Sequence, residues 1–421
     1  MDLKRIERPR GTRDFLPEDM EKRRELENTI RSIVESFGYR EIQTPTFEHL
    51  ELFTIKSGEE IVKEMYSFKD KSGRDLALRP ELTAPVMRLL VNECSHLPKP
   101  IRFYYFSNCF RYERPQRGRY REFWQFGVEL IGSDSYLADA EVIYLAYKIL
   151  KSLNINFELR VGHVGLLRFI LRDLDETHTS RVMRLIDKKD IKGLIEFFEN
   201  IKVNKETKEI LLSIVEKSGR SDILDDVKSI VSDFNFGHIE KVCEILDNLE
   251  VDYKLDFGIA RGLDYYTGIV FEAYAEGLGA QNQVCGGGSY RLAHLFGGED
   301  IPCTGFALGF DRLMEIYECK PRGKIKIVVV DLGYKSDALK VAEIIRDSVK
   351  GVSVITDTME RSVKKQLSYA NDIKADFALF VGKKELETGK FSFKNLKTGE
   401  QFELSLDDII NKIKMYTQQK A

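Results

Sequence analysis

The hydrophobic period of the sequence changes twice, and this interruption constrains the fold more than any other feature. Between about Gly165 and Val251, apolar residues recur at close to 3.6-residue spacing among Lys, Glu and Asp, and proline is absent. Strand-like sequence precedes this segment at 157–161 and returns at 253–257. We therefore expect a helical insertion, 165–251, within one sheet-containing domain formed by residues 1–164 and 252–320.

Helical periodicity within that domain predicts helices over 18–38, 138–153 and 310–317. Pro321-Arg-Gly323 predicts a linker, and after it the pattern becomes strand, helix, strand, helix, strand. These elements are expected at 325–330, 338–349, 352–355, 363–371 and 377–381. Residues 324–421 thus predict a separate α/β domain. Its first strand is followed by Asp331-Leu-Gly-Tyr rather than a glycine fingerprint, which disfavours a dinucleotide site there.

Composition is that of a soluble globular protein. The 421 residues are 43% hydrophobic and 32% charged, and they exceed what one ordinary core accommodates. No apolar run approaches the roughly 20 residues that span a bilayer. The N-terminus is charged rather than signal-like. We therefore expect a cytoplasmic protein of two or three domains without membrane contact.

Charge and metal-binding residues restrict the function further. Net charge is −3, but residues 322–421 carry 19 basic against 14 acidic side chains, while the remaining 321 residues carry 46 against 54. A basic C-terminal unit is a weak indication of a polyanionic partner. The six cysteines contain no Cys-x-x-Cys pair and the six histidines are scattered, so we expect reduced thiols and no metal site.

The segment Arg261-Gly-Leu-Asp-Tyr-Tyr-Thr-Gly-Ile-Val-Phe-Glu272 combines strand-like alternation with unusual polarity. In a strand, alternating members of Arg261, Leu263, Tyr265 and Tyr266 could line a pocket, and the glycines would let a ligand approach the backbone. The structural alternative is an amphipathic hairpin that contains an ion pair.

A second polar concentration lies upstream, where five arginines and one glutamate occur within residues 111–121. Pro115 and Gly118 predict a strand, a loop and a strand rather than a helix. Forked guanidinium groups on such a loop suit phosphate oxygens. On the outgoing strand, Phe123, Gln125 and Glu129 share one face, as expected for a small polar substrate.

Two further segments are less specific. Glu81 and Thr83 lie between Pro80 and Pro85, which would fix a carboxylate for an ammonium group, although Glu81 could equally begin a helix. The run Gly305-Phe-Ala-Leu-Gly-Phe-Asp-Arg312 predicts a strand that passes into a helix carrying Arg312, and a helix start with an arginine attracts phosphate.

Together these segments resemble the class II aminoacyl-tRNA synthetases, and the histidyl-tRNA synthetase family specifically. The 261–268 run resembles its first histidine signature and Cys285-Gly-Gly-Gly-Ser-Tyr290 its second. Residues 110–121 resemble motif 2 and 305–312 motif 3. The segments 10–14 and 38–45 also match, the latter as the dimer-forming motif 1. The resemblance implies an antiparallel-sheet catalytic domain (α+β) with a helical insertion, an α/β anticodon-binding domain, and a homodimer.

The resemblance also implies the reaction, in which histidine and ATP form histidyl-adenylate before transfer to the 3′ end of tRNA(His). It assigns these residues to histidine: Glu81, Thr83, Arg111, Gln125, Glu129, Arg261, Tyr265 and Tyr266. Glu81 and Thr83 would hold the α-ammonium group with help from Gln125. Glu129 and Tyr266 would contact the two imidazole nitrogens, so that a substrate lacking either nitrogen leaves a buried polar group unpaired.

For ATP, the implied ligands are Arg111, Arg119, Phe123 and Arg312. Arg111 would hold the α-phosphate and Phe123 would stack on adenine, with Arg312 towards the γ-phosphate and Mg²⁺ on the triphosphate. Arg111 and Arg261 would be the catalytic residues, because Arg261 stabilises charge that develops at the α-phosphate. No resident metal is expected.

For tRNA, the resemblance implies that Arg114 and Gln116 read the extra base pair of tRNA(His), although Arg114 could instead bind phosphate without reading sequence. One departure stands out: Ser289 and Arg291 flank Tyr290 where the family has Arg and Asp. The rival expectation is an inactive paralogue, such as the regulatory subunit of ATP phosphoribosyltransferase. Such paralogues lose active-site arginines and the anticodon-binding domain, both of which are present here. A sensor domain detached from its kinase is a weaker rival, because the sequence contains no kinase segment.

Overall fold

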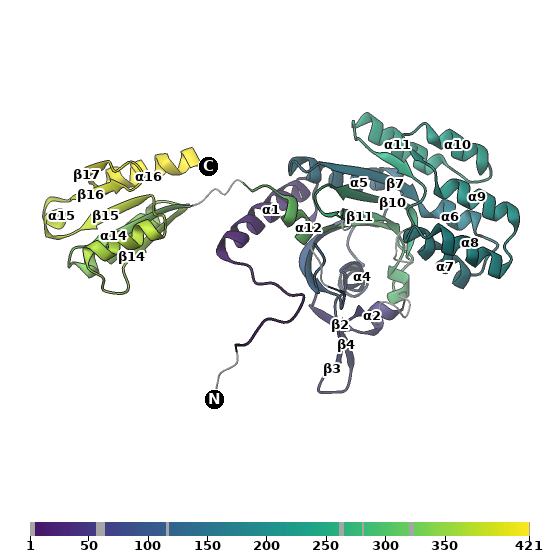
Figure 1. Ribbon diagram of the computed structural model, residues 1–421, viewed down its shortest axis with the longest axis horizontal. Helices are drawn as coiled ribbons and strands as arrows, with labels where there is room; N and C mark the ends of the chain where they lie inside the picture. Colours follow the sequence, from purple (N-terminus) through teal and green to yellow (C-terminus); the bar gives the residue numbers. More distant parts are fainter. Residues whose placement is uncertain are drawn as a thin grey trace. The chain divides into compact units, whose positions relative to one another are not determined.

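The computed structural model describes residues 5–55, 64–114, 118–260, 265–279, 282–319 and 324–420. The chain divides into two compact units, Met1–Cys319 and Lys320–Ala421, and each is described by itself (Figure 1). Among the described residues, no helix is both long and apolar enough to cross a membrane.

The first unit is built on a nine-stranded sheet with the strand order β1-β5-β6-β12-β11-β10-β7-β9-β8. Its strands are β1 (Arg40–Glu41), β5 (Ile101–Phe110), β6 (Glu122–Ile131), β7 (Phe157–His163), β8 (Ser218–Gly219), β9 (Lys254–Asp256), β10 (Tyr266–Ala275), β11 (Gln283–Tyr290) and β12 (Cys303–Gly309). The central pairings from β5 to β7 are all antiparallel, and only β1 with β5 and β7 with β9 run parallel. The expected antiparallel-sheet fold is therefore confirmed.

Strand register brings the unusual residues of the sequence opposite one another. Tyr266 of β10 pairs with Tyr290 of β11, and Gly305 of β12 pairs with Glu129 of β6. On the other side of β6, Tyr105 of β5 is opposite Gly127. Segments more than 100 residues apart in sequence thus meet on adjacent strands.

Helices and a small second sheet complete the catalytic unit. The small sheet has the order β2-β4-β3. These elements are α1 (Pro17–Ser36), β2 (Phe47–His49), α2 (Glu51–Thr54), β3 (Ser67–Lys69), β4 (Asp75–Leu78), α4 (Thr83–Leu89), a π-helical turn (Leu90–Cys94), α5 (Tyr136–Ser152), a 3₁₀ turn (Ala293–Phe296) and α12 (Phe310–Ile316). The predicted helices at 18–38, 138–153 and 310–317 correspond to α1, α5 and α12. Helix α1 packs on α5 and α12 through the apolar stripe of Leu26, Ile30 and Val34.

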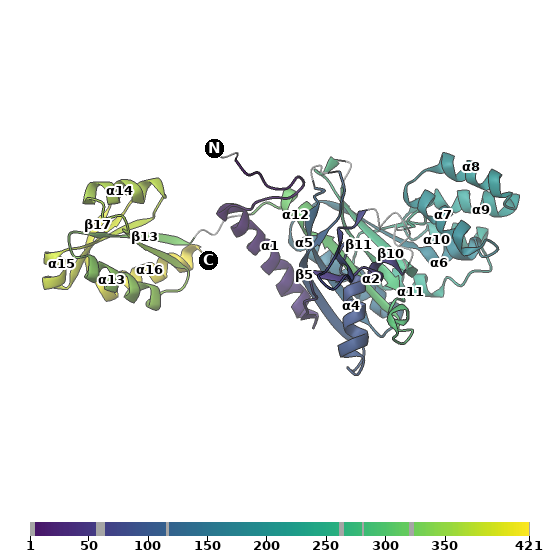
Figure 2. The same ribbon diagram turned by 90° about the horizontal axis from the view of Figure 1, so that it is seen from below.

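The segment with helical periodicity forms a cluster of helices beside β7 and β10 (Figures 1 and 2). They are α6 (Val164–Ile170), α7 (Glu176–Asp187), α8 (Ile191–Ile201), α9 (Lys205–Val215), α10 (Ile223–Ile230) and α11 (Gly237–Asn248). Asp175, Asp190 and Asn204 begin α7, α8 and α9 by accepting hydrogen bonds from backbone N–H groups of the first turn. The two-residue strand β8 lies within this segment and was not expected from its sequence.

The second unit holds a five-stranded sheet in the order β14-β13-β15-β16-β17. Its elements are β13 (Ile325–Asp331), α13 (Lys335–Ser348), β14 (Val352–Thr356), α14 (Val363–Asp372), β15 (Phe377–Val381), α15 (Lys383–Thr388), β16 (Lys390–Asn395), β17 (Gln401–Ser405) and α16 (Leu406–Lys420). Helices α13 and α16 cover one face and α14 the other (Figure 2). The predicted α/β alternation is confirmed, and the antiparallel β16–β17 hairpin extends it.

Candidate active site

A cavity of about 520 Å³ lies on the large sheet and collects most of the site residues that the sequence predicts. The predicted residues that line it are Glu81, Thr83, Arg111, Arg119, Phe123, Gln125, Glu129, Tyr265, Tyr266 and Arg312. Arg114 is exposed and does not line this cavity. Arg261 and Gln116 lie outside the described residues. The strand predicted from the first signature is observed as β10, which begins at Tyr266.

Glu129 is the polar centre of one part of the cavity. Tyr290 donates a hydrogen bond to its Oε2 at 2.6 Å, while Thr83 and Tyr105 donate to Oε1 at 3.1 and 3.3 Å. Burial raises the pKa of Glu129 to about 8, although the hydroxyl donors favour the charged form. The carboxyl group can therefore gain or lose a proton near neutral pH.

Aromatic rings enclose this carboxyl group. The ring centroid of Tyr265 lies 4.9 Å from that of Tyr266 and 5.5 Å from that of Tyr290. Burial raises the pKa values of Tyr265 and Tyr290 well above the usual range, so both phenols stay protonated. The result is a compartment with apolar walls and several hydroxyl groups, of a kind that recognises a small polar ring.

Glu81 lies two residues before helix α4 (Thr83–Leu89), and its side chain caps the first turn, which agrees with its interpretation as a helix-start residue. Its carboxylate accepts hydrogen bonds from the backbone N–H groups of Thr83 at 2.6 Å and Ala84 at 3.0 Å. Burial raises the pKa of Glu81, and the backbone donors and Arg111 oppose that rise. These contacts fix the carboxylate at the cavity wall.

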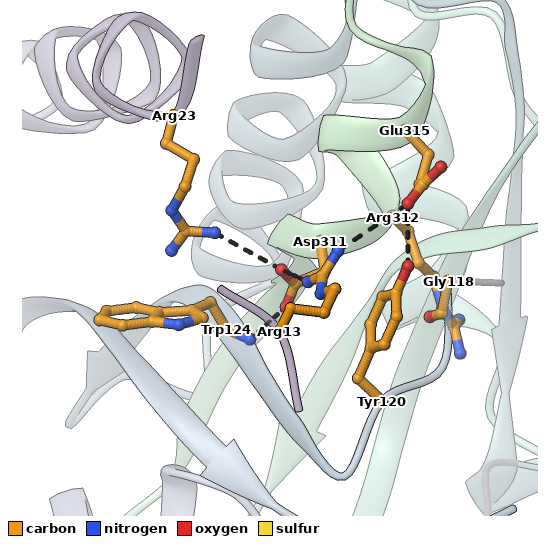
Figure 3. Close-up of polar contacts among 8 residues, drawn as sticks. All are labelled: Arg13, Arg23, Gly118, Tyr120, Trp124, Asp311, Arg312 and Glu315. Carbon is orange, nitrogen blue, oxygen red and sulfur yellow. Dashed lines mark hydrogen bonds and ion pairs between the residues drawn. The ribbon is translucent and has the colours of Figure 1, made fainter. Parts of the chain in front are cut away.

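Arg111, Arg119 and Arg312 also line the cavity, and Arg119 forms an ion pair with Glu113. Arg111 donates from Nε to the carbonyl of Pro80 at 3.0 Å, and its guanidinium carbon lies 5.2 Å from the ring centroid of Phe123. Arg312 donates from Nε to the carbonyl of Gly118 at 3.2 Å (Figure 3). Burial lowers the pKa of Arg312, and the charges of Arg119 and Arg111 lower it further. Such mutually repelling cations suit a polyanionic ligand.

Some residues of the cavity escaped the sequence analysis. Tyr105 contacts Glu129 and lies beneath Gly127, where a side chain would overlap the tyrosine ring. Gly305 is required for the same reason, because a Cβ there would overlap the Glu129 carboxylate. A tyrosine opposite a glycine is the signal for this arrangement, but it becomes visible only when the strand register is known.

Ser289 and Arg291, which flank Tyr290 and differ from the family pattern, both form hydrogen bonds with nearby residues. Ser289 donates to Asp139 of α5 at 2.8 Å, and the same carboxylate contacts His238 of α11 at 2.8 Å. Arg291 donates to the side chain of Asp300 at 3.1 Å and to its carbonyl at 3.0 Å. Tyr290 itself faces Glu129. The two altered residues therefore tie the sheet to α5 and to a loop, while the tyrosine between them belongs to the pocket.

One of the cysteines, Cys285, lines the cavity. All six cysteines are free. Within the described ranges, no group of three or more His, Cys, Asp or Glu side chains could hold a metal ion.

The family model described as histidyl-tRNA synthetase matches residues 11–313, and the model described as anticodon binding domain matches residues 324–416. The chain belongs to the histidyl-tRNA synthetase family. Among curated relatives, the histidine–tRNA ligase of Archaeoglobus fulgidus is 56% identical over 408 residues, which cover 97% of this chain and 99% of the relative. The corresponding ligase of Methanosarcina acetivorans is 53% identical over 97% of this chain and 98% of its own length.

Solved structures agree with this membership. The crystal structure of histidyl-tRNA synthetase from Nostoc sp. PCC 7120 matches with a TM-score of 0.79 at 27% identity, covering 98% of this chain and 99% of that one. The expected family resemblance, the class II catalytic fold and the anticodon-binding domain are thus confirmed. The anticodon binding domain model covers the second unit, which the sequence predicted from its alternating strands and helices and its basic charge.

Proposed function

We propose that this chain is a histidine–tRNA ligase, which activates L-histidine with ATP and transfers the histidyl group to tRNA(His). The observation that carries the proposal is a single cavity lined both by a group of carboxyl and phenol side chains and by three arginines. The carboxyl and phenol groups suit an imidazole, and the arginines suit a triphosphate. Ligases of this name, more than half identical over nearly the whole chain, support the same activity.

Histidine recognition belongs to the Glu129 compartment. Glu129 and Tyr266 contact the two imidazole nitrogens, and Tyr265 forms the wall. Glu81, held by the first turn of α4, faces the α-ammonium group together with Thr83 and Gln125. An amino acid without ring nitrogens could not add a hydrogen bond to Glu129 beyond those from Tyr290, Thr83 and Tyr105, which is a basis for discrimination.

ATP binds the arginines. Arg111 holds the α-phosphate while Arg312 and Arg119 take the remainder of the triphosphate, and Mg²⁺ enters with ATP as part of that substrate. Phe123 is half-buried in the cavity wall and offers its ring to adenine. Arg261 stabilises charge at the α-phosphate as the histidine carboxylate attacks. Placement and fixed charge, without a covalent enzyme intermediate, supply the rate enhancement.

The polyanionic partner is tRNA(His). Its anticodon loop binds the basic C-terminal unit, and Arg114 and Gln116 of the motif 2 loop contact its acceptor end. The chain acts as a homodimer through motif 1, as the family resemblance implies. An inactive regulatory paralogue is disfavoured, because Arg111, Arg119 and Arg312 converge in the cavity and the anticodon-binding domain is present.

Histidine-dependent exchange of pyrophosphate into ATP, followed by charging of total tRNA, tests the proposal. The intact chain should perform both, with histidine and with no other amino acid. Arg261→Ala should abolish exchange while histidine binding stays measurable, because the arginine stabilises developing charge and other residues of the compartment still hold the amino acid. Absence of both activities in the intact chain would refute the ligase assignment, and full exchange activity in Arg261→Ala would refute the role of Arg261.

A further inference from the structure

Asp311, the neighbour of Arg312, joins three separate elements. Its Oδ1 accepts from Arg13 of the N-terminal segment and, at 3.5 Å, from Arg23 of α1. Its Oδ2 accepts from the backbone N–H of Trp124 on β6 at 2.5 Å (Figure 3). The residue is 2% exposed, and burial raises the pKa of its carboxyl group against the opposing charges of Arg13 and Arg23. These donors therefore hold the first turn of α12 against β6.

Arg13 reaches beyond Asp311 to the motif 2 loop. Its guanidinium carbon lies 3.4 Å from the ring centroid of Tyr120, a close cation–π contact. The hydroxyl of Tyr120 donates at 3.0 Å to Glu315 of α12, whose carboxylate lies 3.9 Å from Arg13. One guanidinium thus contacts both the loop and the helix that carries Arg312 (Figure 3).

The main chain of the N-terminal segment reinforces this contact. The carbonyl of Gly11 accepts from the backbone N–H of Arg121 at 2.9 Å, and the carbonyl of Arg10 lies 3.5 Å from the Arg121 guanidinium. Residues 10–13 therefore run along the returning side of the motif 2 loop. This is the Arg10-Gly-Thr-Arg-Asp14 segment, to which the sequence analysis assigned no role.

The contacts of Arg13 with Asp311 and with the motif 2 loop both lead to Arg312. The residue follows Asp311 directly, and it donates to the carbonyl of Gly118 in the same loop that Arg13 holds through Tyr120. Arg13 does not line the cavity that contains Arg312; it lines a neighbouring cavity between α1 and β6. Any effect of Arg13 on ATP must therefore pass through Asp311, Tyr120 and the loop.

We propose that Arg13 is a positioning residue for ATP, which fixes the motif 2 loop against helix α12 so that Arg312 and Arg119 meet the triphosphate in one geometry. The proposal rests on the ligase function, and it assigns the positioning of the phosphate-binding arginines to the N-terminal segment. A displacement of about 1 Å in a charged clamp can cost as much as a hundredfold in rate. Arg13 contacts Asp311, Tyr120 and Glu315 rather than the side chains around Glu129, so histidine binding should not depend on it.

Arg13→Gln tests this role, with Arg13→Lys as the conservative variant and Arg8→Gln as the matched control. Arg8 lies in the same segment, but its ion pair with Asp14 is exposed on both sides. Kinetics of histidine-dependent pyrophosphate exchange give separate KM values for ATP and histidine. Arg13→Gln should lower kcat/KM for ATP by on the order of tenfold to a hundredfold and leave KM for histidine within about twofold.

The other variants sharpen the result. Arg13→Lys should recover part of the loss, because an ammonium group can still pair with Asp311 but cannot cover the Tyr120 ring in the same way. Arg8→Gln should match the wild type. Unchanged kcat/KM for ATP in Arg13→Gln would overturn the proposal, and so would an equal rise in both KM values, which indicates general destabilisation.

Loss of a buried ion-pair partner can also prevent folding. If Arg13→Gln does not fold, Arg13→Lys decides the question, since wild-type ATP kinetics in that variant would contradict the positioning role. A wild-type chain without exchange activity would instead overturn the ligase function itself, so the two failures are distinguishable.

Discussion

Glu129 shows how one residue serves a site at the expense of the fold. Its carboxyl group is buried among Tyr290, Thr83 and Tyr105, and its pKa is raised to about 8 by burial. An unfolded chain releases this proton near pH 4. Between these two values the folded protein binds a proton that the unfolded chain lacks, so its stability falls as pH rises towards 8.

Glu129→Gln removes this titration, because the amide is neutral and its size is nearly unchanged. We expect the variant to gain stability relative to the wild type as pH rises from about 5 to 8, by on the order of a few kcal/mol, since each pKa unit corresponds to about 1.4 kcal/mol. Urea denaturation of both proteins at several pH values measures the gap. A gap independent of pH would contradict the raised pKa. Histidine activation should be strongly impaired in the same variant.

At the scale of elements, strand pairing builds the pocket out of small residues. Gly127 makes room for the Tyr105 ring on β5, and Gly305 makes room for the Glu129 carboxylate on β6. Gly127 and Gly305 therefore form the floor of the compartment, beneath the side chains of Tyr105 and Glu129.

Gly305→Ala is expected to damage histidine binding more than ATP binding. The new methyl group would overlap both Glu129 and the carbonyl of Val128, and overpacking of this kind typically costs about 1–3 kcal/mol. We expect kcat/KM for histidine in pyrophosphate exchange to fall by at least about tenfold.

Gly237→Ala is a suitable control, since its added methyl would meet only the end of the Asn235 side chain. Equal histidine kinetics in the Gly305 and Gly237 variants would show that the floor tolerates a methyl group.

Elements with clear periodicity were predictable, and long-range pairings were not. The stripe on α1 and the interrupted arginine run between β5 and β6 follow from local sequence. The contact of Tyr105 with Glu129 depends on a register that no local pattern contains. The contacts of Asp311 could not be predicted either, because its partners at positions 13, 23 and 124 are distant in sequence.

At the scale of the whole molecule, the two units have separate cores. One cluster of buried residues extends from Leu26 to Leu313, and the clusters around Val329 and Val328 lie entirely within the second unit. Because the catalytic cavity draws only on the first unit, adenylate formation and tRNA binding should be separable.

Truncation after Lys320 is therefore expected to leave histidine-dependent pyrophosphate exchange within a few-fold of the intact chain. Charging of tRNA(His) should weaken by more than about tenfold at subsaturating tRNA, because the basic unit no longer contributes binding energy. Parallel exchange and charging assays measure the difference. Equal charging rates for both chains would contradict the anticodon role of residues 324–416.

The glycines beneath the compartment limit which substitutions can enlarge it. Every substitution at positions 127 or 305 adds atoms, so mutation at these two positions can make the compartment shallower but never deeper. Variants that accept a bulkier amino acid must therefore arise in the walls, at Tyr265, Tyr266 or Thr83. An engineering library aimed at larger histidine analogues would accordingly vary these three positions and leave the glycines untouched.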